Sequence, residues 1–314
     1  MSKSEPVPFP YTSTTLLLPK LPTTEEILAC PNVLWDRSTK VVAINDEIVI
    51  KFGCTTIWEG QALIYLERHV PNVSAPRLYA MYKEWNEEDK RDQVFLVMRR
   101  APGVRLDDIW DSLTESEKDD IVSKLKRNFE IMREVQCLFG SEAGDFYGGL
   151  DGKGLPHSLF YCQKEGRGCL GPYYGEEAFV EGLVGNFRAY TERNGRPDYK
   201  VRYYEKYLAR VLNGHRPRLT HRDVQRKNII VNENPSRKND QGEHSFDVVL
   251  VDWVNAGWVP EYRDFFCASS PLLFDYWEED WCWRVQEFLQ VWPAELEIMR
   301  MLYKDMGGGG VGGF

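Results

Sequence analysis

The residues best suited to chemistry in this chain form one short polar segment and one isolated aspartate. In the segment 221–228, Asp223 and Asn228 stand five residues apart, directly before an apolar run. An Asp at such a site can accept or orient a substrate hydroxyl, and the following Asn can bind Mg²⁺ through its amide oxygen. Further on, Asp252 ends the apolar run Val248–Val251, where a carboxylate can hold a metal between phosphates. This pattern favours phosphoryl transfer.

A lysine and a glutamate earlier in the chain complete the pattern. Lys51 ends the hydrophobic run Ile48–Ile50, and Glu59 follows eight residues later at the start of an expected helix. In kinases, a strand lysine contacts the α- and β-phosphates of ATP and is held by a helix glutamate. Each residue also has an ordinary interpretation, since a strand-end lysine often reaches into solvent and a glutamate stabilises the first turn of a helix. The order of the four parts favours the phosphotransferase interpretation.

Short β-branched runs dominate the chain before residue 100. Val41–Ile44 and Ile48–Phe52 flank a short polar turn and predict a hairpin. The apolar spacing of Ile57–Val70 predicts a helix, and Val94–Met98 predicts a buried strand. The break at Arg99–Gly103 separates this strand-rich part from a helical one.

Helices are expected to dominate after the break. Thr114 and Glu117 form a predicted capping box. The helix that it starts has a predicted buried stripe of Ile121, Leu125, Phe129 and Met132. We expect further helices over 177–188, 201–212 and 271–303, short strands over 229–231 and 248–251, a long irregular segment over 140–176 and a flexible insertion over 232–246. The predicted fold is α+β and two-lobed like a protein kinase, with a small β-rich lobe over 1–100, a hinge at about 98–103, a mainly helical lobe over 101–306 and a flexible Gly-rich tail over 307–314.

Composition and charge restrict the class of protein. The 314 residues are 43% hydrophobic, which is enough for a sizeable core. With 39 basic and 48 acidic residues the net charge is −9, which disfavours a nucleic-acid partner because phosphates require a basic face. No apolar run approaches the ~20 residues of a membrane span, and no signal-peptide stretch stands at the N-terminus. Seven scattered cysteines without a Cys-x-x-Cys pair indicate reduced thiols and a cytoplasmic location.

Several segments together resemble one enzyme family. They are Trp35–Val42, Ile48–Gly53, Glu59–Leu63, Met98–Gly103, Trp110–Leu113, Gly171-Pro172, Leu219–Asp223, Asn228–Val231, Val251–Trp253 and Ala256–Tyr262. The chain resembles the aminoglycoside phosphotransferase and choline kinase-like family, in particular its fungal-type members of unassigned substrate. The resemblance extends over roughly residues 35–270 and implies the same two-lobed fold.

By this resemblance, Asp223 is the catalytic base, and Asn228 and Asp252 bind magnesium. Lys51 contacts the phosphates of ATP, and Glu59 holds Lys51. The implied reaction is ATP- and Mg²⁺-dependent transfer of the γ-phosphoryl group to a hydroxyl of a small molecule, such as an amino alcohol, a sugar or an aminoglycoside. Neither the acceptor nor the oligomeric state follows from the sequence.

The resemblance also implies contacts to the rest of the nucleotide. Backbone groups around Met98 and Arg100 would bind the adenine ring. Ser38, in the first turn of the small lobe, would contact the phosphates. No glycine-rich loop is evident at that turn.

The catalytic segments depart from the family pattern at three places. Arg222 stands where the family usually has Gly, Val224-Gln225 replaces the usual Leu and a His or similar residue, and Val254-Asn255 follows where an acid often stands. These departures leave open a second function, that of a catalytically inactive kinase-like module that binds a nucleotide or another ligand. A protein kinase is disfavoured because the chain has no Gly-rich loop, no Ala-Pro-Glu element and no room for an activation segment.

Ordinary roles are the alternatives for the other polar residues. Asp223 and Asn228 could be turn residues, and Asp252 could face solvent at a strand end. His221 is expected to bond the backbone of the catalytic segment rather than to move protons. Three tryptophans of the last helical region, Trp277, Trp281 and Trp283, are expected in the core.

Overall fold

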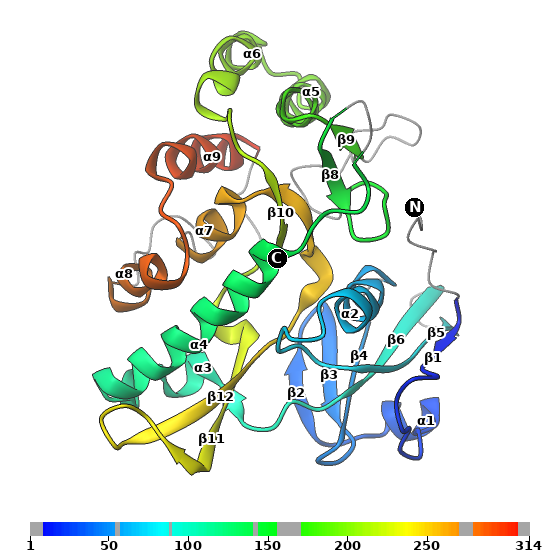
Figure 1. Ribbon diagram of the computed structural model, residues 1–314. Coiled ribbons are helices and arrows are strands. Elements are labelled where there is room, and N and C mark those ends of the chain that lie inside the picture. Colours follow the sequence, from blue (N-terminus) through cyan, green and yellow to red (C-terminus); the bar gives the residue numbers. More distant parts are fainter. Residues whose placement is uncertain are drawn as a thin grey trace. The chain divides into compact units, whose positions relative to one another are not determined.

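The computed structural model describes residues 9–53, 57–87, 90–140, 144–155, 171–269 and 279–306, so the predicted Gly-rich tail and Trp277 lie outside the described residues. The fold is α+β, as predicted, with strands concentrated before residue 100 and helices in the second half of the chain (Figure 1). The chain divides into two compact units. The sheet unit comprises the described residues of Glu5–Ile121 together with Arg226–Val254. The helical unit comprises the described residues of Val122–Gln225 and those from Asn255 onward. The lobe boundary near residue 100 stays a prediction.

The sheet unit begins with a six-stranded antiparallel sheet. Its strands are β1 (Tyr11–Thr12), β2 (Val33–Asp36), β3 (Thr39–Ala43), β4 (Ile48–Gly53), β5 (Leu78–Asn86) and β6 (Arg91–Arg99). They lie in the order β1-β5-β6-β4-β3-β2. The predicted hairpin is confirmed as β3 and β4, and the predicted buried strand is the second half of β6. β4 pairs with β3 on one side and with β6 on the other. Its backbone is therefore hydrogen-bonded along both edges, which fixes the positions from which its side chains project.

Aromatic and aliphatic side chains cover one face of this sheet. Phe95 stacks with Phe52 and Tyr82 at ring-centroid distances of 5.3 and 5.2 Å. Ile27, from the short helix α1 (Thr24–Leu28), is fully buried in the same cluster. A side chain of this size contributes about 1.5–3 kcal/mol when it is fully buried. This face therefore anchors the residues before β2 to the sheet.

The opposite face carries the predicted helix, α2 (Ile57–His69). Successive strand residues point to opposite faces, so Leu96 lies on the other side of the sheet from Phe95. A Cβ added to Gly60 would lie 2.5 Å from Met81 Sδ and 3.2 Å from Leu96 Cδ2. The helix backbone thus sits directly on β5 and β6 at Gly60. This close packing fixes the first turn of α2 against the sheet.

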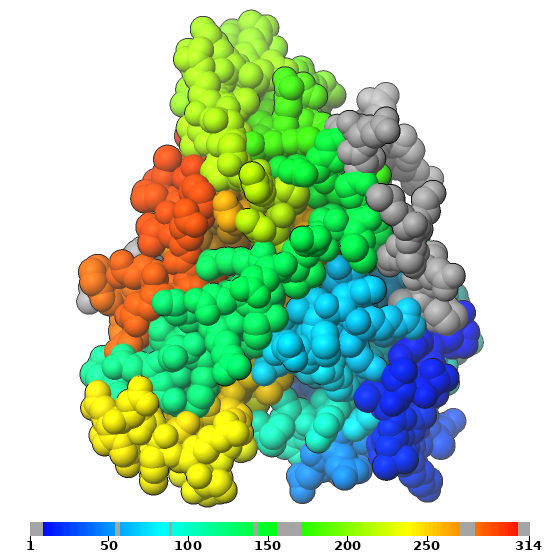
Figure 2. Space-filling model, viewed as in Figure 1, coloured from blue at the N-terminus to red at the C-terminus, as the bar shows by residue number. Residues whose placement is uncertain are grey.

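The polar stretch 232–246, expected to be a flexible insertion, is instead ordered as a long hairpin. β11 (Ile229–Lys238) pairs antiparallel with β12 (His244–Leu250), and β7 (Val104–Arg105) completes a three-stranded sheet. Asp120 accepts the backbone N–H of Phe246 at 2.8 Å, which ties the hairpin to the neighbouring helix. The prediction was wrong because most of these polar side chains face solvent, so the segment has no apolar pattern that would reveal its strands. The hairpin lies at the surface, where its atoms are yellow in Figure 2.

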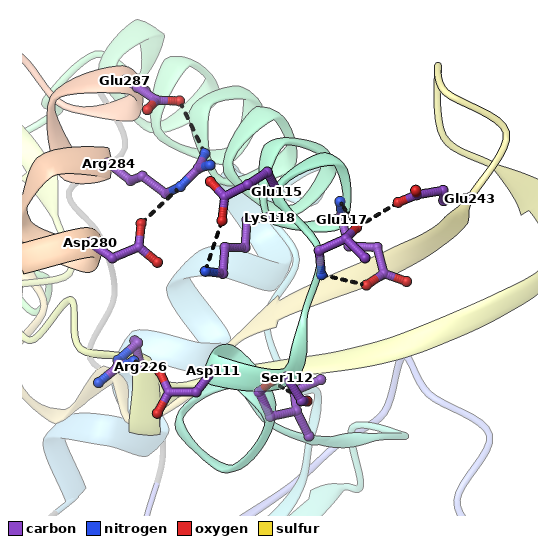
Figure 3. Close-up of polar contacts among 12 residues, drawn as sticks. Asp111, Ser112, Glu115, Glu117, Lys118, Arg226, Glu243, Asp280, Arg284 and Glu287 are labelled. Atoms are coloured by element: carbon purple, nitrogen blue, oxygen red, sulfur yellow. Dashed lines mark hydrogen bonds and ion pairs between the residues drawn. The ribbon is translucent and has the colours of Figure 1, made fainter.

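A long helix begins at the predicted capping box. α4 (Glu115–Glu134) follows α3 (Leu106–Ile109) and the 3₁₀ turn η1 (Trp110–Ser112). The Thr114 N–H donates to Glu117 Oε2 at 3.0 Å, and the Glu117 N–H donates to Thr114 Oγ1 at 3.2 Å. The Thr114 hydroxyl also donates to Glu243 of the hairpin at 2.5 Å (Figure 3). The predicted stripe of Ile121, Leu125, Phe129 and Met132 is buried throughout.

The helical unit contains a small antiparallel sheet and the remaining helices. The sheet has the order β10 (Pro217–Thr220), β13 (Gly257–Pro260), β8 (Phe146–Gly149) and β9 (Tyr173–Tyr174). The helices are α5 (Glu176–Arg193), α6 (Tyr199–Val211), α7 (Tyr262–Ser269), α8 (Glu279–Phe288) and α9 (Pro293–Asp305). The expectation of irregular structure over 140–176 is wrong at β8 and β9, whose short Gly- and Tyr-rich sequences lack an alternating pattern. Residues 156–170 of that segment lie outside the described residues.

The tryptophans of α8 have different environments. Trp281 is buried, as predicted, whereas Trp283 is 65% exposed, so the expectation of a core position for Trp283 is wrong. Residues two apart on a helix point to different faces, so the two rings cannot share one environment. Within the described residues, no helix has the length and apolar character needed to cross a bilayer.

Candidate active site

Lys51 is the centre of a charged cluster in the sheet unit. It lies on the inner strand β4, opposite Val41 of β3 and Leu96 of β6. Its Nζ lies 2.6 Å from Glu59 Oε2 and 2.6 Å from Asp252 Oδ1. The structure therefore brings together three of the residues that the sequence predicts for the nucleotide site.

The position of Glu59 is fixed by burial and by a hydrogen bond to the backbone. It is in the first turn of α2, is only 2% exposed, and accepts the backbone N–H of Trp253. Burial raises the pKa of Glu59, and Asp252 adds to this shift, although Lys51 opposes it. Burial by itself would lower the pKa of Lys51, but Glu59 and Asp252 outweigh it and the pKa is raised. Lys51 therefore stays cationic at neutral pH.

Asp252 and Asn228 are brought together by the β11–β12 hairpin. Ile229 faces Leu250 across the hairpin, and the Val251 N–H donates to the Asn228 carbonyl at 2.9 Å. Asn228 ends the 3₁₀ turn η3 before β11, and Asp252 follows β12. Both side chains therefore leave the same end of the hairpin.

The side-chain oxygen atoms of Asn228 and Asp252 are suitable ligands for a magnesium ion. A carboxylate and an amide oxygen are the ligand types that Mg²⁺ prefers, and Mg²⁺ in phosphoryl-transfer sites takes its other ligands from phosphates and water. The described residues contain no group of three or more His, Cys, Asp or Glu side chains that could hold a metal by themselves. Asn228 and Asp252 are the residues at this end of the hairpin that could hold Mg²⁺.

The segment that contains Asp223 lies in the helical unit, directly after β10. Asp223 is 1% exposed, and its Oδ1 accepts a hydrogen bond from Gln225 Nε2 at 2.6 Å. The Asp223 backbone N–H donates to His221 Nδ1 at 3.2 Å, which agrees with the expected structural role of that histidine. Gln225, an unexplained departure in the sequence, therefore orients the predicted base.

Backbone strain occurs in both of the segments that carry the predicted catalytic residues. Three non-glycine residues in the described chain have a positive φ: Lys90 at 53°, Arg222 at 65° and Asp252 at 65°. The left-handed region costs an L-residue about 1–2 kcal/mol, and strain of this kind is often found at functional sites. The family pattern usually has Gly at the position of Arg222, where a glycine would adopt the same φ without this cost.

Asp264 is the residue of this site that the sequence did not reveal. It is in the first turn of α7, is 4% exposed, and its Oδ1 accepts the Arg222 N–H at 2.8 Å. It also accepts the backbone N–H of His221. Burial raises the pKa of Asp264 to about 6, although these two hydrogen bonds oppose the shift. Asp264 therefore holds the strained backbone of the two residues that precede Asp223 in the chain.

The residues predicted to contact the rest of the nucleotide have varied environments. Ser38 is exposed in the turn between β2 and β3, and Met98 is a buried residue of β6. Arg100 follows β6, its N–H donates to the Glu47 carbonyl at 2.9 Å, and its guanidinium donates to the Asn45 carbonyl at 3.1 Å. The backbone donor of Arg100 is therefore used within the sheet unit. The nucleotide contacts of these three residues stay predictions.

Comparison with known proteins gives matches in structure but not in sequence. No protein-family model matches the chain, and no curated protein matches it. The ternary complex of APH(2'')-IIa with streptomycin and ATP covers 88% of this chain and 83% of its own, with a TM-score of 0.54 and 14% identity. The ADP-bound aminoglycoside phosphotransferase APH(2'')-Ib covers 88% of this chain and 90% of its own, with a TM-score of 0.51 and 15% identity.

A third similar structure is the complex of a thermostable mutant of the aminoglycoside phosphotransferase APH(4)-Ia with ADP and hygromycin B. It covers 90% of this chain and 81% of its own, with a TM-score of 0.51 and 12% identity. The chain has the aminoglycoside phosphotransferase fold. The predicted two-lobed, kinase-like fold class is thereby confirmed. The fungal-type and choline kinase-like parts of the resemblance stay predictions.

Proposed function

We propose that this protein is a small-molecule phosphotransferase that moves the γ-phosphoryl group of ATP to a hydroxyl of its substrate with the help of Mg²⁺. The observation that carries the proposal is the position of Lys51 Nζ, 2.6 Å from both Glu59 and Asp252. In kinases, the phosphate- and metal-binding half of the site has three such parts. They are a lysine on an inner strand, a glutamate in a helix and an aspartate after a strand. The shared fold with proteins whose structures were solved with ATP or ADP supports the same function.

Each residue has a distinct part in the proposed reaction. Lys51 contacts the α- and β-phosphates, and Glu59 keeps the ammonium group in place. Asn228 and Asp252 hold Mg²⁺, which when bound neutralises charge on the phosphates. Asp223 accepts or orients the hydroxyl of the acceptor, and Gln225 fixes the direction of the Asp223 carboxylate. The protein thus contributes mainly positioning and charge stabilisation.

The acceptor is proposed to be a hydroxylated amine, a sugar or an aminoglycoside-like molecule. Aminoglycosides are named in the complexes of similar structures, with streptomycin in one and hygromycin B in another. A panel of these three acceptor classes, assayed for ADP release with ATP and Mg²⁺, tests the proposal. ADP release that depends on one acceptor class supports it. ATP binding without transfer to any acceptor or to water would instead identify a catalytically inactive module.

The role of Asp223 is tested by substitution. We expect Asp223→Ala to lower kcat at least ~10³-fold while the affinity for ATP changes little, because this carboxylate acts on the acceptor and not on the nucleotide. The matched control is Asp240→Ala, which removes an exposed aspartate at the hairpin turn and should leave kcat unchanged. Turnover of Asp223→Ala within a few-fold of wild type would contradict the assignment of the base.

A further inference from the structure

Trp35 lies on the same face of the six-stranded sheet as Lys51. Four of its strands lie side by side in the order β2, β3, β4, β6 (Figure 1). Trp35 of β2 is opposite Val41 of β3, and Val41 is opposite Lys51 of β4. Residues directly opposite each other in an antiparallel pair point their side chains to the same face. Trp35 is therefore two strands, or about 10 Å of sheet, away from Lys51 on one face.

A guanidinium group is stacked on the Trp35 ring. Arg37, in the turn between β2 and β3, has its guanidinium carbon 5.0 Å from the centroid of this ring. Arg105 of β7 approaches the same ring at 5.7 Å, but it forms ion pairs with Asp108 at 2.6 Å and with Asp107 at 3.4 Å. The charge of Arg105 is thus neutralised by two carboxylates. The contact with Trp35 places the guanidinium of Arg37 on the Lys51 face of the sheet.

The carboxylate that precedes Arg37 in the chain lies on the other face. Asp36 is opposite Lys40 across the β2–β3 hairpin, and the two form an ion pair at 3.5 Å. Lys40 is in turn opposite Phe52, which belongs to the aromatic cluster of that other face. Among the described residues, no carboxylate forms an ion pair with Arg37, which is exposed. The Lys51 face therefore carries a cation that the sheet unit does not neutralise.

The turn that carries Arg37 contains no glycine. It reads Asp-Arg-Ser-Thr over residues 36–39. In protein kinases, a glycine-rich loop covers the phosphates. Here the backbone N–H of Arg37 is already used, because it donates to the Thr39 carbonyl at 3.2 Å. The guanidinium instead offers five N–H donors in a planar fork that matches phosphate oxygens. The turn therefore favours recognition of phosphates by a side chain.

We propose that Arg37 binds the phosphates of ATP that follow the α-phosphate, in place of the backbone donors of a glycine-rich loop. The inference rests on the proposed function, in which Lys51 contacts the α- and β-phosphates. A phosphate chain that starts at Lys51 would extend along the row of Val41 and Trp35 to reach Arg37. Arg37 would then make the site selective for nucleoside triphosphates, because AMP has no phosphate that reaches the turn.

Nucleotide titration of the full chain tests this role. The Kd values of ATP and AMP are measured by calorimetry at constant Mg²⁺ and ionic strength for wild type, Arg37→Met and Arg37→Lys. We expect Arg37→Met to weaken ATP binding about 10-fold and to change the Kd of AMP less than about 2-fold, since it removes charge-assisted hydrogen bonds to the later phosphates. Arg37→Lys keeps the cation and should recover part of the ATP affinity. Because Arg37 is exposed, its substitution should not prevent folding.

Lys40→Met is the matched control. It removes the same charge three residues away in the chain but on the opposite face of the sheet, so the Kd of ATP should not change. Equal weakening of ATP and AMP by Arg37→Met, no weakening of ATP, or an equal loss in Lys40→Met would overturn the proposal. If Arg37→Met binds ATP normally and wild type still transfers phosphate, only this inference fails. A wild type that binds no ATP would contradict both the inference and the proposed function.

Discussion

At the scale of single residues, Lys51 neutralises the buried carboxylate of Glu59, and its proposed second role is to contact phosphates. The two roles can be separated. We expect Lys51→Met to destabilise the protein by about 3–5 kcal/mol, because it leaves the buried Glu59 without its cation. The double variant Lys51→Met/Glu59→Gln should recover most of this loss but should not recover ATP affinity. Urea unfolding and ATP titration measure the two effects. A double variant no more stable than Lys51→Met would contradict the role given to the pair.

The pH dependence of the free energy of unfolding should report the raised pKa of Asp264. Its pKa is raised to about 6 in the folded protein, against an ordinary value of 3.8. A carboxyl with a raised pKa binds its proton more tightly in the folded state, so it contributes stability at low pH that is lost as the pH rises through about 6. Asp264→Asn cannot titrate and should lack this contribution.

The measurement for Asp264 is the free energy of unfolding of wild type and Asp264→Asn between pH 4 and pH 7. We expect the wild type to gain stability relative to the variant as the pH falls from 6 towards 4. All other groups are common to both proteins, so the difference between the two curves isolates Asp264. Parallel curves over this range would show that the carboxyl is not perturbed.

Some residues of the candidate site could be predicted from the sequence, and others could not. Lys51, Glu59 and Asp252 could be predicted because each follows or begins a recognisable run, and the structure brings them within ion-pairing distance. Asp264 could not, because it acts on the backbone of Arg222, 42 residues away, and a backbone contact leaves no pattern in the sequence. Gln225 was noticed only as a departure from a family pattern.

At the scale of elements, the connection between β6 and β7 depends on one glycine. Gly103 has φ of 106°, and an added Cβ would lie 2.1 Å from the Val231 carbonyl oxygen. We expect Gly103→Ala to destabilise the protein by about 2–4 kcal/mol through backbone strain and displacement of β11. Gly140→Ala is the control, since no atom lies within 4 Å of its added Cβ. Urea unfolding checks both, and a small effect for Gly103→Ala would contradict the close approach of the strands.

Elements with one apolar face were predictable, and those with two polar faces or very few residues were not. α4 combines a capping box with a buried stripe, so its beginning and its inner face both follow from the sequence. The strands predicted over 229–231 and 248–251 are confirmed as the base of the β11–β12 hairpin. Residues 232–246 look like a loop because most of their polar side chains face solvent, and their order comes from contacts such as that between Asp120 and Phe246. Strands of two to four residues, such as β9, are too short to show a period.

At the scale of the whole molecule, the fold could be predicted although no curated protein and no protein-family model matches the chain. The kinase-like arrangement follows from four functional parts in a fixed order, and structures of 12–15% identity share the fold. The acceptor could not be predicted, because fold similarity does not carry substrate identity. Binding of a metal–nucleotide complex is therefore the most direct test of the central claim.

That test is a thermal-shift measurement with ATP and Mg²⁺, added separately and together, on wild type, Asp252→Ala and the control Asp240→Ala. We expect a rise in Tm of about 3–6 °C in wild type and in the control, only when both ligands are present. Asp252→Ala should not show the rise, because it removes the carboxylate that we propose to bind the metal next to Lys51. No rise in wild type at millimolar ATP with Mg²⁺ would contradict the proposal that this protein uses ATP.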